Sequence, residues 1–233
     1  MGAGPGAGGA RDAGDPVRAG DRAGEQPAPP RILDRQGLAQ IVERLGAQIA
    51  ADHPDGVVVV GVLKGALIFM ADLVRAIHGI DVQVDFMAIS RFAPDTGRVR
   101  IVKDVDLDLA GRDVVVVEDL VDTGLTATYL QRQLAARGPR TLDFCALLDR
   151  PVRRIVPLDV RYVGVEIPDV FVLGYGLHLT DLYRNLGEVF EADRRVVQED
   201  PAAYVGVLYG RVQGRTDAPQ DSTHNGPENP GTS

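Results

Sequence analysis

The sequence is short of cysteine and of aromatic side chains, and it contains no tryptophan. One of its 233 residues is cysteine, and aromatic residues make up 5% of them. A single cysteine excludes an intrachain disulfide and a zinc site built from cysteines. Because Cys145 lies in the apolar run FCALL, we interpret it as a small core residue.

Long hydrophobic runs are missing as well. No stretch approaches the roughly 18 apolar residues of a membrane-spanning helix, and the first residues lack the apolar segment of a secretory signal. We therefore expect a soluble, cytoplasmic protein that does not bind membranes. The formal net charge of −8 argues against a broad nucleic-acid-binding surface. It does not exclude a phosphate ligand, because backbone N–H groups and a metal ion bind phosphate on acidic proteins too.

Large apolar side chains are scarce at both ends of the chain. Residues 1–30 consist mostly of glycine, alanine, proline, arginine and aspartate, and residues 211–233 are rich in polar residues, glycine and proline. Such segments bury too little apolar surface to offset the entropy that ordering costs. We expect disordered tails over 1–30 and 211–233 and one folded domain over 31–210, a size that supports a single core.

Hydrophobic periodicity predicts strands that alternate with helices. Apolar residues three and four positions apart indicate a helix over 35–51, and continuous β-branched runs indicate buried parallel strands over 57–62 and 113–117. The remaining expected elements are helices over 67–77 and from the 118–126 segment to about 137, and strands over 81–90, 99–103, 141–148, 162–166 and 171–174. This order predicts an α/β fold with a mainly parallel sheet flanked by helices.

The strand expected over 81–90 alternates between apolar and polar residues. Valine or phenylalanine stands at 82, 84 and 86, and aspartate or glutamine stands at 81, 83 and 85. An alternation of period two predicts that the polar face of this strand is exposed to water.

Two loops follow the two most apolar strands, at the sheet edge where α/β proteins bind ligands. The first is the 63–66 segment, LKGA, and the second is the 118–126 segment, EDLVDTGLT. A helix is expected to begin within the second loop, and the N–H groups and dipole of its first turn favour a phosphate. Gly124 allows the backbone to approach that phosphate closely. The carboxylates of Glu118 and Asp119 suit the hydroxyls of a sugar or a cation, so the whole segment predicts a sugar-phosphate site with Mg²⁺.

The Asp-Thr-Gly triplet at 122–124, taken alone, has a second interpretation. Asp122 or Thr123 is a suitable N-cap residue for the following helix, and a cap needs no ligand. Only the complete segment, placed after an apolar strand, favours the phosphate site.

The run VVVVEDLVDTGLT over 114–126 closely resembles the motif with which type I phosphoribosyltransferases bind phosphoribosyl pyrophosphate (PRPP), and the chain is similar to their hypoxanthine-guanine (6-oxopurine) branch. The resemblance covers residues 32–195. The further matching segments, in the order of the family, are 61–66, 84–90, 100–104, 162–169, 171–176 and 183–186. The resemblance implies the type I phosphoribosyltransferase fold with a small hood region beside the main sheet. It also implies Mg²⁺-dependent transfer of 5-phosphoribosyl from PRPP to hypoxanthine or guanine in purine salvage, by a homodimer or homotetramer.

The resemblance assigns phosphate-binding, metal-binding and catalytic roles to individual residues. It implies that Glu118 and Asp119 bind the ribose hydroxyls, directly or through Mg²⁺, and that Asp122 is the general acid or base near N7 of the purine. The residues that match the 5′-phosphate loop are Thr123, Gly124, Leu125 and Thr126. Those that match the pyrophosphate site are Leu63, Lys64, Gly65 and Arg184, and the family has a non-proline cis peptide bond in the 63–65 loop. Without these motifs Lys64 would be interpreted as a solvated surface lysine.

The base-binding residues follow from the same resemblance. Phe171 matches the aromatic residue that stacks on the purine, and Val172 matches the residue whose backbone contacts the purine edge. Taken alone, Phe171 would be assigned to the core. Arg150 stands where the branch usually has a lysine that donates to the 6-oxo group. Arginine still donates to a carbonyl oxygen, but through a larger planar fork.

Two further positions depart from the family. His178 stands where an aspartate usually binds Mg²⁺, and because neutral imidazole is a poor ligand for that ion we assign it no metal role. Arg91-Phe92 replaces the Ser-Tyr pair of the loop that closes over the reaction. Arg91 is equally well explained as a pyrophosphate contact or as a solvated side chain.

These departures leave three functions open. The first is ordinary salvage of hypoxanthine or guanine. The second is phosphoribosylation of a non-standard purine-like base, such as a 7-deazapurine in specialised metabolism. The third is a regulator that senses PRPP without turning it over. Asp122 and Lys64 favour an enzyme, and the negative net charge disfavours DNA binding.

Overall fold

The computed structural model describes residues 26–90 and 100–210. The tail expected over 211–233, most of the tail expected over 1–30 and the Arg91-Phe92 pair lie outside these residues. So does the 93–97 segment, APDTG, whose composition predicts a loop. The domain limits at 31 and 210 therefore stay a prediction.

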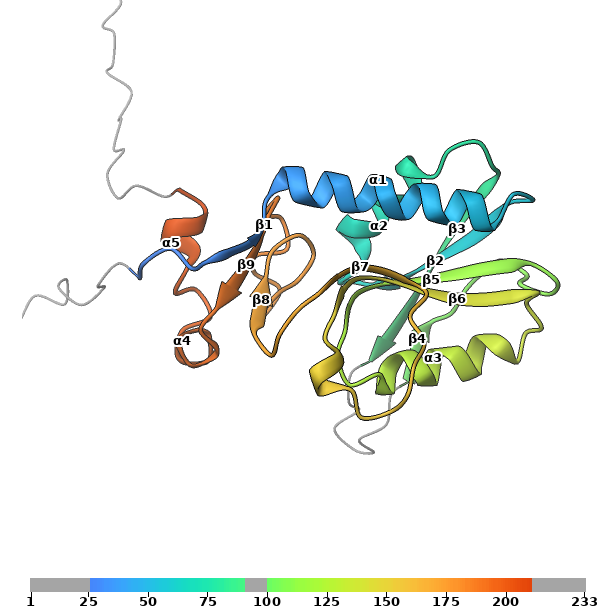
Figure 1. Ribbon diagram of the computed structural model, residues 1–233. Helices are drawn as coiled ribbons and strands as arrows, with labels where there is room; N and C mark the ends of the chain where they lie inside the picture. Colours follow the sequence, from blue (N-terminus) through green and yellow to red (C-terminus); the bar gives the residue numbers. More distant parts are fainter. Residues whose placement is uncertain (1–25, 91–99, 211–233) are drawn as a thin grey trace, which may run out of the picture.

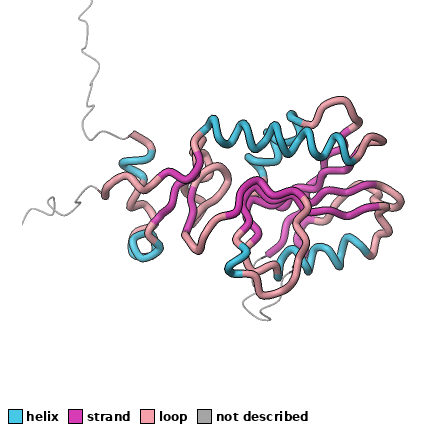
Figure 2. The backbone as a smooth tube through the Cα atoms, in the orientation of Figure 1, coloured by secondary structure: helices cyan, strands magenta, loops and turns pink. Residues whose placement is uncertain are grey.

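A six-stranded, mainly parallel sheet forms the centre of the fold (Figures 1 and 2). Its strands are β2 (Val57–Leu63), β3 (Val82–Ser90), β4 (Arg100–Lys103), β5 (Asp113–Val121), β6 (Thr141–Asp149) and β7 (Tyr162–Glu166). They lie in the order β4-β3-β2-β5-β6-β7. Strand β4 is antiparallel to β3, and the other pairs are parallel. The predicted α/β fold is confirmed.

Helices cover both faces of this sheet. Helices α1 (Arg35–Asp52) and α2 (Leu67–Ala76) lie on one face, and α3 (Leu125–Ala135) lies on the other (Figure 1). In β2, Val59 packs into the core with α1 and α2, whereas its neighbour Val58 packs into the core with α3. The continuous apolar run of this strand follows from burial on both faces. Among the described residues, no helix has both the length and the apolar character needed to cross a bilayer.

A second, antiparallel sheet forms the small hood region. Its strands are β1 (Arg31–Leu33), β9 (Val189–Ala192) and β8 (Phe171–Leu173), in that order. The short helices α4 (Arg194–Glu199) and α5 (Val205–Leu208) lie beside it (Figure 1). A turn of 3₁₀ helix (Pro151–Arg153) follows β6 in the main domain. Hydrophobic periodicity did not predict β1, β9 or the two short helices, because segments of three to six residues show too few repeats.

Strand β5 is longer than the sequence pattern predicts. It continues past Val117 to Val121 because β6 continues beside it, and Val121 pairs with Asp149. The predicted end at 117 is therefore wrong. As a consequence, a strand holds Glu118 and Asp119, each with 7% of its surface exposed.

The polar residues of β3 do not all face water. The prediction holds for Gln83, which is exposed, but fails at Asp85, which is 6% exposed while Val84 is 44% exposed. The segment after β4 covers the Asp85 carboxylate, which accepts hydrogen bonds from the backbone N–H groups of Asp106 and Leu107 at 2.7 and 2.9 Å. Burial of Asp85 is possible because this segment supplies donors that replace water.

A network of buried polar side chains lies at the opposite end of β5 from the acidic pair. The His53 imidazole bridges Asp113 and Tyr162, with Nδ1 and Nε2 each 3.1 Å from the partner oxygen. Arg140 donates two hydrogen bonds of 2.8 Å to Asp113. The hydrogen bonds from Arg140 and the contact with His53 hold the pKa of Asp113 well below its usual value, although burial of the carboxyl group opposes this.

We expect Asp113→Asn to destabilise the fold at neutral pH and to flatten its pH dependence. A carboxyl group whose folded-state pKa lies below the unfolded value of about 3.9 stabilises the fold above that value. This contribution is lost as the pH falls towards the folded-state pKa. The loss at pH 7 should be about 1–2 kcal/mol, a low figure for a buried acceptor because its partner Arg140 is half exposed.

Urea unfolding at a series of pH values from about 7 down to 2.5 measures both effects. The difference between wild type and Asp113→Asn should shrink as the pH falls. Asp55→Asn is a matched control, because the exposed Asp55 carboxylate lies 3.8 Å from the same Arg140. An equal loss in the control, or parallel pH profiles for Asp113→Asn and wild type, would contradict the prediction.

Candidate active site

The carboxyl ends of β2 and β5 bring the two predicted loops into contact. These strands are parallel neighbours, so both loops lie at the same edge of the sheet. A Cβ atom built on Gly65 would lie 1.9 Å from Oδ2 of Asp119. The backbone of the predicted pyrophosphate loop thus touches a side chain of the predicted sugar-binding pair, and any larger residue at 65 would displace one of the two. The Leu63–Lys64 peptide bond is cis, as the resemblance implies.

Gly124 is the N-cap residue of α3 and has a positive φ of 81°. Neither Asp122 nor Thr123 therefore occupies the cap position that the second interpretation of the triplet requires. The backbone oxygen of Thr123 accepts hydrogen bonds from the N–H groups of Ile155 and Val156 at 2.9 and 3.3 Å. These bonds fix the backbone just before the helix. The turn into the helix itself is made by Gly124, whose lack of a side chain permits the positive φ.

Asp122 follows β5 and is flanked by two arginines from the segment after β6. Arg150 Nη1 lies 3.4 Å from its Oδ2, and Arg153 Nε lies 3.5 Å from its Oδ1. Arg150 is 3% exposed and also donates to the backbone oxygen of Val170. Burial lowers the pKa of the Arg150 guanidinium, and the charge of Asp122 offsets part of that effect. The structure thus joins the predicted proton-transfer group to the predicted base-binding arginine.

A polar pocket of about 310 Å³ lies beside Arg153. Its lining residues are Arg153, Asp169, Val170, Phe171, Glu191, Ala192 and Arg194. The Arg194 guanidinium lies 5.7 Å from the centroid of the Phe171 ring, a distance at which a cation and a ring attract each other. Phe171 is half-buried and lines the pocket, whereas Val172 is 4% exposed and packs in the core.

Lys64 and Arg184 bind the same carboxylate, that of Asp181. Lys64 Nζ lies 3.2 Å from Oδ2 of Asp181, and Arg184 Nε and Nη2 lie 3.2 and 2.9 Å from Oδ1. Arg184 Nη1 also donates to the backbone oxygen of Gly176 at 2.6 Å. A Cβ atom on Gly176 would lie 2.3 Å from the backbone oxygen of Gly65. Arg184, the predicted pyrophosphate-contacting arginine, therefore lies beside Lys64 of the predicted pyrophosphate loop, although the two are far apart in the sequence. The resemblance implies a role for the backbone N–H groups of that loop, and the structure adds the Lys64 side chain as a second cation beside it.

Residues 30–179 match the family model described as the phosphoribosyl transferase domain. The chain belongs to the phosphoribosyltransferase family. It is 42% identical over 178 residues to the hypoxanthine-guanine phosphoribosyltransferase of Mycobacterium avium, and the alignment covers 72% of this chain and 87% of that relative. It is 45% identical over 167 residues to the hypoxanthine phosphoribosyltransferase of Haemophilus influenzae, with 68% and 91% covered. The crystal structure of a hypoxanthine-guanine phosphoribosyltransferase from Bacillus anthracis has a TM-score of 0.67 and 40% identity, covering 70% of this chain and 98% of that chain. The predicted family and its type I fold are confirmed.

Glu118 and Asp119 are the predicted carboxylate ligands of a magnesium ion. Mg²⁺ prefers oxygen ligands, and enzymes commonly hold it with one or two carboxylates together with substrate phosphate oxygens and water. Both carboxylates are nearly buried, and that of Asp119 lies beside the 63–66 loop, which fits such a partial protein shell. Within residues 26–90 and 100–210, no group of three or more His, Cys, Asp or Glu side chains is placed to hold an ion by itself.

His178, at the position where the family usually has an aspartate, contacts Asp181. Its Nδ1 accepts a hydrogen bond of 3.1 Å from the backbone N–H of Asp181, so this nitrogen acts as an acceptor in the observed arrangement. Thr180 and Asp181 have positive φ values of 47° and 62°. Such values are uncommon outside glycine, although aspartate tolerates them better than most residues. His178 thus supports the turn that directs Asp181 towards the cations.

Sequence reasoning missed three residues of this site. They are Asp181, Arg153 and Arg194. The available signal was spacing alone: Asp181 precedes Arg184 by three positions, and Arg153 follows Arg150 by three. Spacing of this kind is common on protein surfaces, so it did not distinguish these residues from solvated ones.

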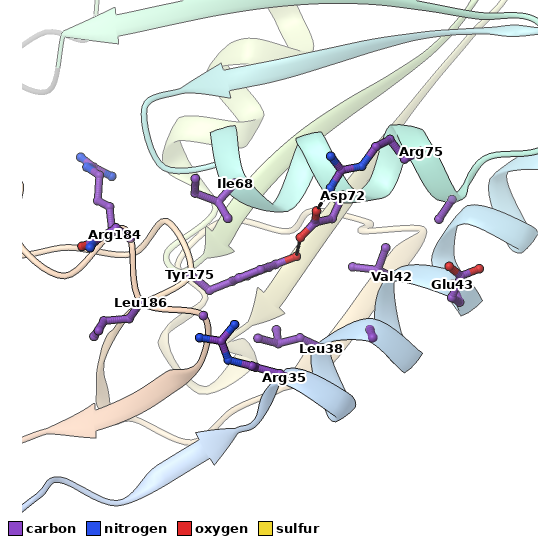
Figure 3. A pocket seen from close by; sticks show the side chains of 14 residues that line it. Arg35, Leu38, Val42, Glu43, Ile68, Asp72, Arg75, Tyr175, Arg184 and Leu186 are labelled. Atoms are coloured by element: carbon purple, nitrogen blue, oxygen red, sulfur yellow. Dashed lines mark hydrogen bonds and ion pairs between the residues drawn. The ribbon is translucent and has the colours of Figure 1, made fainter. Parts of the chain in front are cut away.

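A larger pocket of about 510 Å³ lies between α1, α2 and the 175–187 segment (Figure 3). Tyr175 lies across it and donates its hydroxyl hydrogen to Asp72 of α2, which also pairs with Arg75 (Figure 3). Burial and the hydrogen bond to Asp72 raise the pKa of Tyr175, so the phenol stays protonated and donates. This bond ties to α2 the segment that contains Gly176, whose backbone lies against Gly65.

Proposed function

We propose that this chain transfers the 5-phosphoribosyl group of PRPP to hypoxanthine or guanine, yielding the nucleoside 5′-monophosphate and pyrophosphate in purine salvage. One observation carries the proposal: the backbone at Gly65 touches the Asp119 carboxylate, and the same strand β5 leads into a helix whose N-cap residue is Gly124. At this edge of the sheet, the 63–66 loop offers backbone N–H groups to the pyrophosphate, and the start of α3 offers them to the 5′-phosphate. The carboxylates between the two loops suit the sugar. The relatives named for hypoxanthine and guanine support this acceptor over a non-standard base and over a regulator.

The two loops bind the ends of PRPP. Glu118 and Asp119 accept hydrogen bonds from the ribose hydroxyls, and the same carboxylates would hold a Mg²⁺ ion. The 5′-phosphate accepts hydrogen bonds from the backbone N–H and hydroxyl groups of its loop, which consists of Thr123, Gly124, Leu125 and Thr126. When bound, Mg²⁺ neutralises negative charge on the pyrophosphate oxygens.

Lys64 and Arg184 stabilise the pyrophosphate as it leaves. The bond from the anomeric carbon to the pyrophosphate oxygen breaks ahead of full bond formation to the base, so negative charge develops on the leaving group. Cations and the backbone N–H groups of Leu63 to Gly65 are held at that place before the reaction starts. Such preorganised donors stabilise developing charge without reorganisation.

The purine binds between Phe171 and Asp122. Phe171 stacks on the ring, the backbone of Val172 contacts its edge, and Arg150 donates to the 6-oxo group. A ring nitrogen attacks the anomeric carbon from the face opposite to the pyrophosphate. Asp122, which Arg150 and Arg153 orient, receives or returns the proton at N7.

A panel of bases, assayed with PRPP and Mg²⁺ for pyrophosphate release, tests the proposal. We expect turnover of hypoxanthine and guanine, and at least about tenfold slower release with adenine. Adenine carries an amino group in place of the 6-oxo group, which sets a donor against the Arg150 donor. Xanthine and a 7-deazaguanine-type base complete the panel. Turnover of the 7-deazapurine alone would overturn the choice of base, and PRPP binding without release for any base would favour a regulator.

We also propose that the enzyme acts in the cytoplasm as a homodimer or homotetramer. The family resemblance supports the assembly, and the net charge of −8 supports the expectation of no nucleic-acid partner. Light scattering after size-exclusion chromatography measures the mass of the assembly, and a monomer at micromolar concentration would contradict this part of the proposal.

A further inference from the structure

The Asp181 carboxylate lies between the two cations that the proposed function assigns to pyrophosphate. Its two oxygens are divided between them: Oδ2 accepts from Lys64 Nζ at 3.2 Å, and Oδ1 accepts from Arg184 Nη2 and Nε at 2.9 and 3.2 Å. The hydrogen bonds from Arg184 and Lys64 hold the pKa of Asp181 below its usual value, so the group is ionised at neutral pH. Two cations that each bind one oxygen of the same anion form an arrangement that a phosphate group also satisfies.

The Lys64–Asp181 ion pair is exposed to solvent, so another anion is able to replace the carboxylate. The side chains of Lys64 and Asp181 are 68% and 58% exposed, whereas that of Arg184 is 19% exposed. Exposed ion pairs contribute little to stability, because water solvates the separated charges well. A ligand that carries more negative charge than one carboxylate therefore competes well for the same donors.

Other contacts hold the surrounding backbone independently of the Asp181 charge. His178 Nδ1 accepts from the backbone N–H of Asp181, and Arg184 Nη1 donates to the backbone oxygen of Gly176. The positive φ of Asp181 suits asparagine as well as aspartate. An asparagine at this position therefore removes the charge and preserves the turn.

We propose that Asp181 is an internal counter-ion that competes with pyrophosphate for Lys64 and Arg184. The inference rests on the proposed function. Before pyrophosphate binds, the carboxylate holds the two cations close together and offsets their mutual repulsion. When pyrophosphate binds, it takes over the donors of both cations and the Asp181 side chain turns towards water. The displaced carboxylate then repels the bound pyrophosphate, which lowers its affinity and favours its release as product.

Calorimetric titration of the full-length protein with pyrophosphate, with and without Mg²⁺, tests this role. Asp181→Asn should lower the Kd for pyrophosphate about three- to tenfold in both titrations, because a nearby negative charge is gone. Product inhibition by pyrophosphate in the transfer reaction should strengthen by a similar factor. Asp181→Glu keeps the charge and should stay closer to wild type than Asp181→Asn does. Asp55→Asn makes the same change of charge before the start of β2, at the far end of the strand, and should shift the Kd by less than about twofold.

Weaker pyrophosphate binding by Asp181→Asn would overturn the inference, because the carboxylate would then be needed to hold the cations or the metal. An unchanged Kd would overturn it as well. Failure of the proposed function has a different signature, in which the wild-type protein neither binds pyrophosphate nor releases it from PRPP with any base. Thermal unfolding of each variant verifies that the proteins compared are folded.

Discussion

Replacing Asp122 by asparagine is expected to lower turnover by about 10²–10⁴-fold and to leave PRPP binding largely intact. Asparagine fills nearly the same space, but its amide neither receives nor returns a proton at neutral pH. The Asp122 carboxylate lies 3.4 Å from Arg150 and 3.5 Å from Arg153, the second of which lines the polar pocket. Steady-state release of pyrophosphate with hypoxanthine measures turnover, and titration with PRPP and Mg²⁺ measures binding.

Asp169→Asn is the matched control for this prediction. Its carboxylate lies 3.5 Å from the same Arg153 and lines the same polar pocket, but it belongs to the loop before β8 and the resemblance assigns it no proton-transfer role. Loss of the Asp169 charge should lower turnover less than about tenfold, a scale typical of a group that acts through another side chain. Unchanged turnover in Asp122→Asn would remove Asp122 from the proton-transfer role, and a collapse of PRPP binding would make it a binding residue instead.

Gly65→Ala is expected to lower kcat/KM by about 10²-fold or more. The added Cβ would lie 1.9 Å from Oδ2 and 2.4 Å from Cγ of Asp119, so either the loop or the carboxylate must move. Misplacement of catalytic or binding groups by about 1 Å commonly costs 10²-fold in rate. Because the same methyl group disturbs both the pyrophosphate loop and the sugar-binding pair, the KM for PRPP should rise while kcat falls.

Gly206→Ala separates this steric effect from the general consequence of adding a methyl group. A Cβ on Gly206, in α5, would meet no atom within 4 Å. Its kcat/KM should stay within about twofold of wild type, since an exposed substitution without new contacts rarely changes a distant site. Wild-type kinetics in Gly65→Ala would show that the loop and Asp119 do not act together.

The elements that the sequence predicted well are those whose signal is local. The β-branched run at 57–62 and the helical spacing at 35–51 each reflect one segment packing against the rest, and the structure has β2 and α1 at these places. The segments predicted wrongly depend on a neighbour instead. Strand β5 extends to Val121 because β6 continues to pair with it, and Asp85 is buried because the 106–107 backbone donates to it.

The candidate site divides in the same way. Its loops at 63–66 and 118–126 were recognisable because a family motif is a string of consecutive residues. Asp181 and Arg153 were not, because each acquires its place in the site through a partner distant in the sequence, Lys64 and Asp122 respectively.

By itself, the sequence determined the family, the alternation of strands and helices, and the two loops at which phosphates are expected. The tertiary structure alone decided that Gly65 touches Asp119, that Asp181 joins Lys64 to Arg184, and that two arginines flank Asp122. The reason is physical. Periodicity and motifs reflect the local conformation and burial of one segment at a time. The contacts above form between distant segments, once β2 lies beside β5 and the hood packs against the ends of these strands.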